Sequence, residues 1–433
     1  MRHANRTLLA PAAAVVLAIA AAPAANAAPG PGIAGSDPVR DVTVAAPPRP
    51  AVRAASDLAF TGTTRIAPGV DYRTFTTTAA AGPVQGYLLD ADLRRASVGL
   101  LHPADVGARA TVSAMTNAQR GVAGVNGDFF NISETHAGVV PTGSSVGPEV
   151  SGGRDLKAAV PDGQRFGPAL TSGATDEDVL GVGGDRTAHL ASLRLTGTVR
   201  AGRTELAVRG LNQYALPVGG VGAFTHDWGA VSRLRAVCGT DTDRTAACGA
   251  DTAEAVVRHG VVTAVGDAVG AGAIPRGTTV LVGREGGTDR LRTLRPGAHV
   301  RIAYRLTGAE RFRFAIGGLP IRRGGAAVPG LETTGAAPRT AAGIGSGGHR
   351  LSLMVIDGRS AASPGVTLAE LSALLAAVGA DDGVNLDGGG SSAVAVRGPG
   401  DAAATVRNVP SDGTERAVAN GIGVFTPGWP RTP

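Results

Sequence analysis

One run of polar residues in this 433-residue chain has the types and spacing to do chemistry. It extends from Asn385 to Ser392 and reads Asn-Leu-Asp-Gly-Gly-Gly-Ser-Ser. Asn385 and Asp387 alternate with Leu386, so in a strand both polar side chains point to one face. The run predicts a site to which Asn385 brings an amide and Asp387 a carboxylate.

The three glycines after Asp387 extend this candidate site with backbone groups. Gly388, Gly389 and Gly390 carry no side chain, so the chain can approach a ligand closely and turn successive N–H groups toward an anion. Ser391 adds a hydroxyl. The alternative is a Gly-rich hairpin with an Asp cap, but the density of acid, amide, glycine and hydroxyl favours a binding site.

A second candidate is the segment Val125–Asn131, which reads Val-Asn-Gly-Asp-Phe-Phe-Asn after a short apolar run. Asn126 and Asp128 place an amide and a carboxylate where a buried strand is predicted to end. Asn-Gly-Asp alone is most often only a turn. This segment is a candidate functional site only if the fold places it near Asp387.

Three arginines lie near such turns: Arg339, Arg359 and Arg416. A guanidinium offers a planar fork of donors that suits phosphate. Surface salt bridges are the alternative use of each. Together with the glycine run, they indicate an anionic ligand.

Lysine and cysteine content excludes several chemistries. Lys157 is the only lysine, which rules out a P-loop NTPase and any Schiff-base lysine elsewhere in the chain. H-E-x-x-H and C-x-x-C patterns are absent. Cys238 and Cys248 are the only two cysteines. In an exported protein they predict a disulfide that closes a short loop, rather than a metal site.

The polar residues need strands and a helix to position them. Leu351–Ile356 is an apolar run that predicts a buried strand ending at Asp357, a further carboxylate. Thr367 and Glu370 form a capping box, and leucines at helical spacing run from there to Gly379. A short strand follows and leads into Asn385. Ligand sites commonly lie at such strand ends.

The beginning of the chain predicts export. Residues 1–27 combine two arginines, an apolar run and Ala-Asn-Ala, the pattern of a secretory signal peptide. We expect a disordered Ala/Pro-rich linker over 28–57, a β-rich section over 58–113, a larger domain over 114–426 with an insertion at about 231–251, and a tail over 427–433. The predicted location is secreted or cell-envelope, with no transmembrane segment after signal cleavage.

Charge and composition narrow the partners. Lys and Arg number 41 against 35 Asp and Glu, and without Arg2 and Arg6 of the leader the balance is 39 minus 35, or +4. No basic run with interleaved aromatics occurs, so nucleic acid is not a predicted partner. The expected fold class is α+β, a mixed β-sheet core with few helices and a β-rich N-terminal section.

The order of these motifs resembles the phosphodiester glycosidase family. The resemblance covers about residues 114–426 and is carried by Val125–Phe130, Arg339–Gly343, Val355–Arg359, Thr367–Leu371, Asn385–Ser392 and the stretch from Asn408 through Arg416 to Asn420. It implies hydrolysis of a sugar-1-phosphate diester at or beside the anomeric centre, of the N-acetylglucosamine-1-phosphate type. A carbohydrate phosphodiester is then the partner, and the oligomeric state stays open.

The implied chemistry assigns a role to each candidate. A phosphate monoester, with a second pKa of about 6, departs without strong proton donation, so one carboxylate can suffice. Asp387 would be nucleophile or base, with Asp357 as a second carboxylate or an arginine-orienting group. Asp128 is the third catalytic candidate. The substrate-binding candidates are Asn126, Arg339, Asn385, Gly388, Gly389, Gly390, Ser391, Arg359 and Arg416.

Three alternatives remain at this point. Asp128, Asp357 and Asp387 are also potential calcium ligands, because hard cations take carboxylate oxygens; no cofactor is otherwise predicted. A non-catalytic module that binds envelope polymer would use the same arginines and glycines. A phosphodiesterase would cut the P–O bond instead of the sugar's C–O bond.

Overall fold

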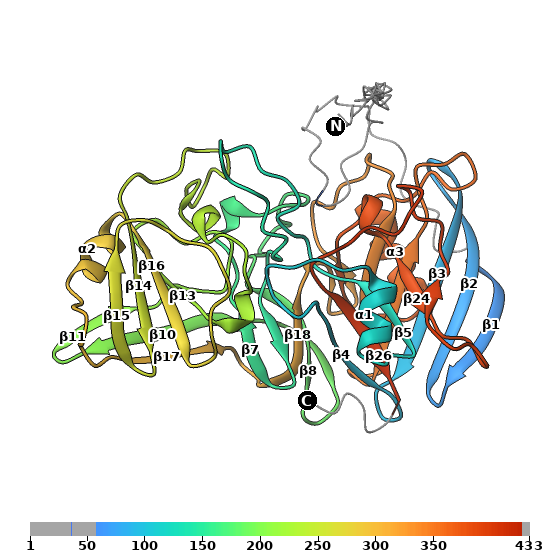
Figure 1. Ribbon diagram of the computed structural model, residues 1–433. Helices are drawn as coiled ribbons and strands as arrows, with labels where there is room; N and C mark the ends of the chain where they lie inside the picture. The colour runs from blue at the N-terminus through green and yellow to red at the C-terminus, as the bar shows by residue number, and fades with distance from the viewer. Residues whose placement is uncertain (1–35, 37–57, 427–433) are drawn as a thin grey trace, which may run out of the picture. The chain divides into compact units, whose positions relative to one another are not determined.

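The structure, a computed structural model, describes residue 36 and residues 58–426, all within one unit, Gly32–Pro433 (Figure 1). The predicted signal peptide, the linker apart from Ser36, and the tail lie outside the described residues. Three short α-helices occur in the described part: α1 (Val112–Ala118), α2 (Gly286–Arg292) and α3 (Leu368–Ala377). Strands dominate, so the predicted α+β class is a coarse match to a mainly β protein.

The largest sheet, sheet A, combines the first three described strands with five strands from the C-terminal third of the chain. Its eight strands have the order β1-β2-β3-β22-β21-β23-β19-β20. Their bounds are β1 Ala59–Ala67, β2 Val70–Ala79, β3 Gly82–Asp92, β22 Arg350–Ile356, β21 Arg339–Gly345, β23 Asp382–Asn385, β19 Leu319–Arg323 and β20 Ala326–Ala327. The predicted N-terminal β-rich section therefore shares a sheet with the predicted site strands, as the blue and orange ribbons show in Figure 1.

Sheet B carries the second polar motif. Its order is β25 (Thr405–Val406), β24 (Val394–Val396), β5 (Ala123–Asn126), β26 (Gly421–Phe425) and β4 (Ser97–Leu101). Helix α1 covers one face through Val112 and Met115, which pack in a cluster with Phe130 and Phe425. Strand β5 itself packs through Ala123 and Val125, which are fully buried in the main core, so Asn126 ends a buried strand.

Three smaller sheets complete the described residues. Sheet C has the order β7 (Arg154–Lys157), β6 (Glu149–Ser151), β18 (Phe312–Gly317), β8 (Asp178–Gly183) and β9 (Ala188–Ser192). Sheet D has the order β11 (Thr204–Ala207), β10 (Arg194–Ala201) and β17 (Arg301–Thr307). Sheet E has the order β12 (Gly210–Leu211), β13 (Val221–Phe224), β16 (Thr278–Arg284), β14 (Thr252–Arg258) and β15 (Val261–Gly266).

Strand direction corrects the predicted mixed sheet. Every pairing in sheets A and B is antiparallel. Among the described strands the parallel pair is β12–β13 in sheet E. The prediction of a mixed core is therefore wrong for the sheets that hold the candidate site. Strand runs in a sequence do not reveal which strands become neighbours, so direction could not be read from them.

Helix α3 follows its predicted signals closely. Thr367 accepts a hydrogen bond from Glu370 N, and the Glu370 carboxylate accepts one from Thr367 N, so the capping box is present. Gly379, just beyond the helix, has a φ of +78°, the left-handed conformation that glycine adopts without strain. The helix packs through Leu375 on Gly343 of β21, where a Cβ would lie 3.1 Å from the leucine.

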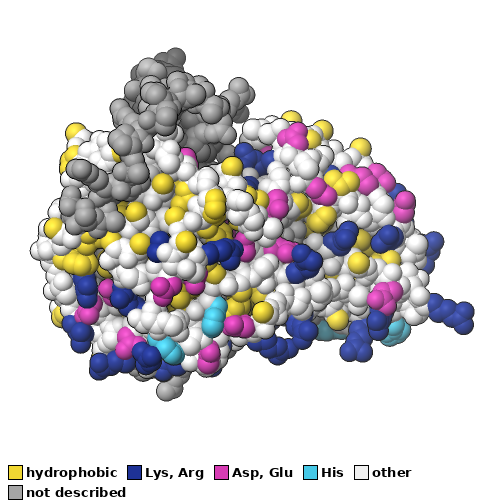
Figure 2. All heavy atoms as spheres, turned by 180° about the vertical axis from the view of Figure 1, so that it is seen from behind, with side chains coloured by type: hydrophobic (Ala, Val, Ile, Leu, Met, Phe, Trp, Pro, Cys, Tyr) yellow, Lys and Arg dark blue, Asp and Glu magenta, His cyan; other side chains and the backbone are white. Residues whose placement is uncertain are grey.

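The surface shows no large field of one charge in the view of Figure 2, where Lys/Arg and Asp/Glu side chains alternate. Exposed ion pairs such as Arg65–Asp71 and Arg200–Glu205 account for part of this mixing. Among the described helices none is long and apolar enough to cross a membrane.

Candidate active site

The register of sheet A gathers the predicted polar residues at one end of its strands. In the antiparallel pair β21–β22, Arg339 lies opposite Ile356, so Arg339 begins one strand where Asp357 follows the other. In the pair β21–β23, Ala341 lies opposite Asn385. Asp387 comes two residues later. The separate sequence motifs thus meet at one end of these strands, where ligand sites commonly lie.

Asn126 connects sheet B to this end of the sheet A strands through hydrogen bonds. Its Nδ2 donates to the carbonyl oxygen of Asp387 at 2.6 Å, and its Oδ1 accepts from Thr340 Oγ1 at 2.6 Å and Ala393 N at 3.1 Å. Asp387 N in turn donates to Gly127 O at 2.8 Å. These bonds give Asn126 a positioning role, because they hold the backbone of Asp387. Its predicted contact with a sugar stays a prediction.

Asp387 is 1% exposed. Its Oδ1 accepts hydrogen bonds from Gly388 N at 3.1 Å and from the backbone N of Ser36 at 2.6 Å. Ser36 is itself fully buried, and its hydroxyl accepts from Phe130 N at 2.8 Å. A residue of the predicted linker therefore contacts the predicted catalytic carboxylate, which no sequence pattern had indicated.

Asn385 is the clearest sign of an unfilled polar site. Its side chain is fully buried, and neither amide atom has a hydrogen-bond partner among the described residues. Leaving a buried polar group without a partner costs about 1–3 kcal/mol. The amide is therefore available to a ligand or water, and its predicted contact with substrate stays a prediction.

The glycine run forms a short 3₁₀ turn, Gly389–Ser391. Gly389 has a φ of +61°, and a Cβ on Gly390 would lie 2.1 Å from Arg416 Nη2. Only glycine allows that approach. Arg416 also pairs with Asp412 at 2.6 Å and donates to Ser391 Oγ at 3.5 Å, so the predicted Arg416 guanidinium lies directly against the turn.

Arg339 is held differently from the prediction. It is fully buried, with Nε donating to Val366 O at 3.0 Å and Nη2 to Gly335 O at 2.7 Å, and it pairs with Glu332 at 3.2 Å. Nη1 has no hydrogen-bond partner among the described residues. Burial lowers the pKa of Arg339 to about 10, and the nearby charge of exposed Arg359 contributes. Its predicted phosphate contact remains a prediction.

The Asp357 carboxylate is surrounded by three hydrogen-bond donors. Tyr87 Oη donates to its Oδ2 at 3.0 Å, and Val409 N to its Oδ1 at 3.0 Å. Asn408 links it to the glycine run, donating weakly to Asp357 Oδ1 at 3.4 Å and to Ser392 O at 3.0 Å. Burial raises the pKa of Asp357. These contacts suit a residue that positions the turn.

Asp128 belongs to a buried network beneath the site. Its Oδ2 accepts from Gly147 N at 2.6 Å, and its backbone N donates to Asn420 Oδ1 at 2.9 Å. Asn420 Nδ2 donates to Glu149 Oε1 at 2.8 Å. Burial raises the pKa of Asp128 to about 6. Asp128 thus holds the backbone of Gly147 through its carboxylate and contacts Asn420 through its own backbone N–H. Its catalytic role remains a prediction.

The single lysine lies in the same network. Lys157 is fully buried and donates from Nζ to Val146 O, Gly147 O and Ala158 O at 2.7–3.0 Å. Burial lowers its pKa to about 8, against the attraction of Glu149, Asp128 and Asp176. Glu149, Lys157 and Asp176 were not predicted, since they come from separate strands and loops without a local motif.

The pKa of Asp176 gives a test of this network. Burial raises it from 3.8 to about 8, although Arg165 Nη1 donates to Asp176 Oδ1 at 2.7 Å. The native state then holds a proton that the unfolded state releases, so the free energy of unfolding falls as pH rises from about 4 to about 8. Asp128 acts in the same direction up to about 6.

We expect Asp176→Asn to flatten that decline, measured by urea unfolding between those pH values. Above pH 8 the lowered pKa of Lys157 acts in the opposite direction, so native stability should rise again. Asp381→Asn, at an exposed acid, is the control and should keep the wild-type profile. An unchanged profile in Asp176→Asn would contradict the assignment.

The calcium and disulfide predictions meet different outcomes. The described residues hold one cluster with metal-ligand spacing, His136 with Cys238 and Cys248, whereas the three predicted aspartates form no such cluster. The two cysteines are joined in a disulfide with an S–S distance of 2.01 Å, which confirms the predicted pair. A cation requirement stays untested.

Solved structures share this fold. A hypothetical protein from Synechocystis matches with a TM-score of 0.64 at 18% identity, over 87% of this chain and 64% of that chain. A proposed exported protein from Burkholderia pseudomallei K96243 matches with a TM-score of 0.66 at 20% identity, over 89% and 100%. This chain thus spans less than two thirds of the Synechocystis chain. No curated protein sequence matches significantly.

A third structure is the catalytic domain of zebrafish N-acetylglucosamine-1-phosphodiester alpha-N-acetylglucosaminidase, auto-inhibited by pro-peptide. It matches with a TM-score of 0.43 at 14% identity, over 85% of this chain and 88% of that chain. The phosphodiester glycosidase family model matches residues 251–425, which include Asn385 and Asp387 but not Asn126. Over residues 251–425 this chain thus matches the phosphodiester glycosidase family, which confirms the resemblance predicted from its motifs.

Proposed function

We propose that this protein is an exported hydrolase that cleaves sugar-1-phosphodiester bonds, of the N-acetylglucosamine-1-phosphate type, in envelope or extracellular glycoconjugates. One observation carries the proposal. In the sequence, buried Asp387 lies between Asn385, whose amide has no hydrogen-bond partner among the described residues, and the glycine turn. All three lie within residues 251–425, the segment that matches the family. The disulfide supports export, because such bonds persist in oxidising compartments.

Asp387 would act at the anomeric carbon. Gly388 N donates to its Oδ1 and so holds the carboxylate in place, where it would serve as nucleophile or general base. Either Asp387 or a water that it deprotonates forms the new bond to the anomeric carbon, and a glycosyl ester formed with Asp387 is then hydrolysed by water. As the C–O bond breaks, the phosphate takes the electron pair. It leaves as a stable anion, so no strong acid has to face Asp387.

The contacts favour Arg416 as the cation beside the leaving phosphate. It lies against Gly390 and pairs with exposed Asp412, whereas Arg339 is fully buried and bound by two backbone carbonyls and Glu332. Donors fixed before the reaction stabilise developing charge without reorganisation. Asn385 would then hydrogen-bond a sugar hydroxyl or acetamido group.

The test is turnover of a small N-acetylglucosamine α-1-phosphodiester in water labelled with ¹⁸O. The proposed reaction places the label on the sugar. A label on phosphate would instead establish a phosphodiesterase that cuts the P–O bond. Binding without product release would establish a non-catalytic polymer-binding module, and either result overturns the proposal.

Ser36 implies that the full-length chain restrains its own site. Its N–H bonds to Asp387 Oδ1, so this residue competes with a substrate for the carboxylate. Ser36→Pro removes that N–H and should raise kcat/KM on the small diester about tenfold, the typical worth of one hydrogen bond to a charged group.

Ser36→Ala is the matched control, because it keeps the N–H and loses only the hydroxyl that accepts from Phe130 N. It should raise activity less than the proline variant. Equal activity of wild type and Ser36→Pro would show that Ser36 does not block the site.

A further inference from the structure

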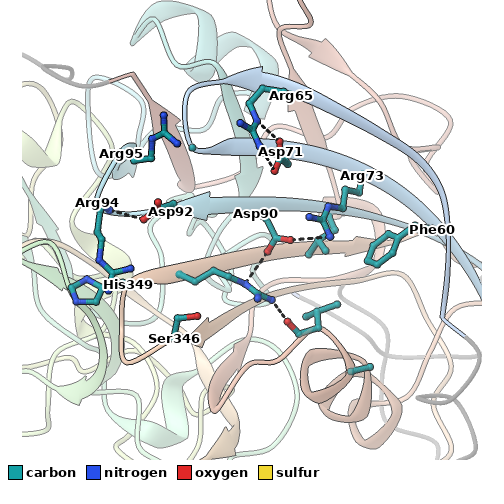
Figure 3. A pocket seen from close by; sticks show the side chains of 15 residues that line it. Phe60, Arg65, Asp71, Arg73, Asp90, Asp92, Arg94, Arg95, Ser346 and His349 are labelled. Atoms are coloured by element: carbon teal, nitrogen blue, oxygen red, sulfur yellow. Dashed lines mark hydrogen bonds and ion pairs between the residues drawn. The ribbon is translucent and has the colours of Figure 1, made fainter.

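An arginine-rich groove lies on sheet A away from Asp387 (Figure 3). Its volume is about 440 Å³, and its lining includes five arginines, three aspartates and His349. We call it the arginine groove. It is formed by β1, β2, β3, the turn between β21 and β22, and the end of α3. No step of the proposed hydrolysis uses these residues.

The register separates the groove from the active site. Asp90 lies opposite Ser352, and Ser352 opposite Gly343, on which α3 packs, so the groove is on the α3 face of the sheet. Asn385 lies on this same face, because it is opposite Ala341, two residues from Gly343, so the groove and the active site are separated along the strands and not by face. The length of β22, about 20 Å, separates the groove residue Arg350 from Asp357.

Two of the three aspartates in the groove form ion pairs with its arginines. Asp71 pairs with Arg65 at 2.7 Å, and Asp90 pairs with Arg350 at 3.3 Å and Arg73 at 3.7 Å. These pairs make the floor close to neutral. They also hold Arg73 and Arg350 in fixed positions across the strands.

Two arginines at the rim are not neutralised. Arg94 and Arg95 are exposed, and neither guanidinium forms an ion pair with any described residue. Asp92, the third acid, accepts a hydrogen bond from the backbone N of Arg94 instead. Arg94 lies beside His349 in Figure 3, and His349 Nδ1 is buried without a hydrogen-bond partner among the described residues. Unmet donors therefore face the groove.

The other end of the groove has a flat apolar group. Phe60 is 45% exposed, and the Arg73 guanidinium lies 5.1 Å from its ring centroid. An aromatic face beside fixed arginines suits a sugar ring followed by an anion. Guanidinium forks match phosphate oxygens well.

We infer that the arginine groove binds a phosphate-bearing glycan chain and so holds a polymeric substrate at a second place, far from the bond that is cleaved. This inference rests on the proposed function for the identity of the chain, but binding can be measured without turnover. The groove would raise the efficiency on polymers above that on small diesters, because a tethered chain has a high local concentration at the site.

The experiment compares two full-length double variants with equal charge change. Arg94→Gln/Arg95→Gln alters the groove rim, and Arg276→Gln/Arg290→Gln removes two exposed arginines of the sheet E region. Both are made with Asp387→Asn, and binding of a short oligomer of hexoses joined by phosphodiester bonds is measured by calorimetry. Inorganic phosphate and neutral dextran are the comparison ligands.

We expect the rim variant to bind the oligomer about tenfold more weakly, with less salt dependence, since two exposed ion pairs are lost. The control variant should bind like its parent, and dextran should not bind. With active Asp387, the ratio of kcat/KM on the oligomer to that on the small diester should fall in the rim variant alone.

Equal oligomer binding by both double variants would overturn the groove assignment. So would binding of inorganic phosphate as strong as that of the oligomer, because it would show a simple anion site. Failure of the proposed function would look different: no small diester would be turned over, while oligomer binding would still depend on Arg94 and Arg95.

Discussion

Replacing Asp387 with Asn is expected to lower kcat on a small sugar-1-phosphodiester by at least about 10³-fold, the scale on which loss of a nucleophile or its base acts. Asn keeps an oxygen that can accept from Gly388 N but has neither negative charge nor basicity. The native fold should persist, because Asp387 positions the loop through its backbone bonds to Asn126 and Gly127. Steady-state kinetics and thermal unfolding measure both properties.

Asp381→Asn is the matched control, since Asp381 is an exposed acid next to β23. It should leave kcat within twofold or so of wild type. Near-normal activity of Asp387→Asn, in a folded sample, would sink the catalytic assignment while leaving the family match untouched.

The second large effect is expected from Lys157→Met. Lys157 is the cation among buried Glu149, Asp128 and Asp176, and three carbonyl oxygens bind its ammonium. Removing one partner of a buried charge network typically costs about 3–5 kcal/mol, because the remaining charges stay desolvated. Urea unfolding at pH 7 should show that loss.

A double variant separates charge from packing. Lys157→Met/Glu149→Gln removes one acid together with the lysine, so it should recover part of the stability lost in Lys157→Met. A loss below about 1 kcal/mol in Lys157→Met would contradict the proposed role of the ammonium. A double variant no more stable than the single would indicate that packing, rather than charge, is responsible.

Local patterns predicted the parts of this structure that local physics decides. The capping box and leucine spacing placed α3, and the alternation around Leu386 placed Asn385 and Asp387 on one strand end. The cysteine pair was also correct. Each depends on residues within about a dozen positions of one another.

What was missed depends on contacts between distant segments. Sheet A pairs β3 with β22 across more than half of the chain, and no pattern in either strand specifies that partner. Glu149 and Lys157 pair across β6 and β7 of sheet C, whereas Asp128 follows β5 of sheet B, so their meeting depends on how these two sheets pack. Arg339 looked like a free phosphate ligand, yet Val366 and Gly335 supply carbonyls to it from a loop whose course the sequence did not reveal.

Under the proposed function, Ser36 would also determine how the hydrolysis is switched on. A blocking residue carried on the same chain has a fixed effective concentration at Asp387, so its occupancy does not change on dilution. A separate inhibitor molecule, by contrast, loses occupancy when the solution is diluted. Under that proposal, release would require either a cut after Ser36, which makes the blocker diffusible, or a substrate dense enough in sugar phosphates to outcompete it locally. A polymer-coated surface supplies such density, and bulk solution does not.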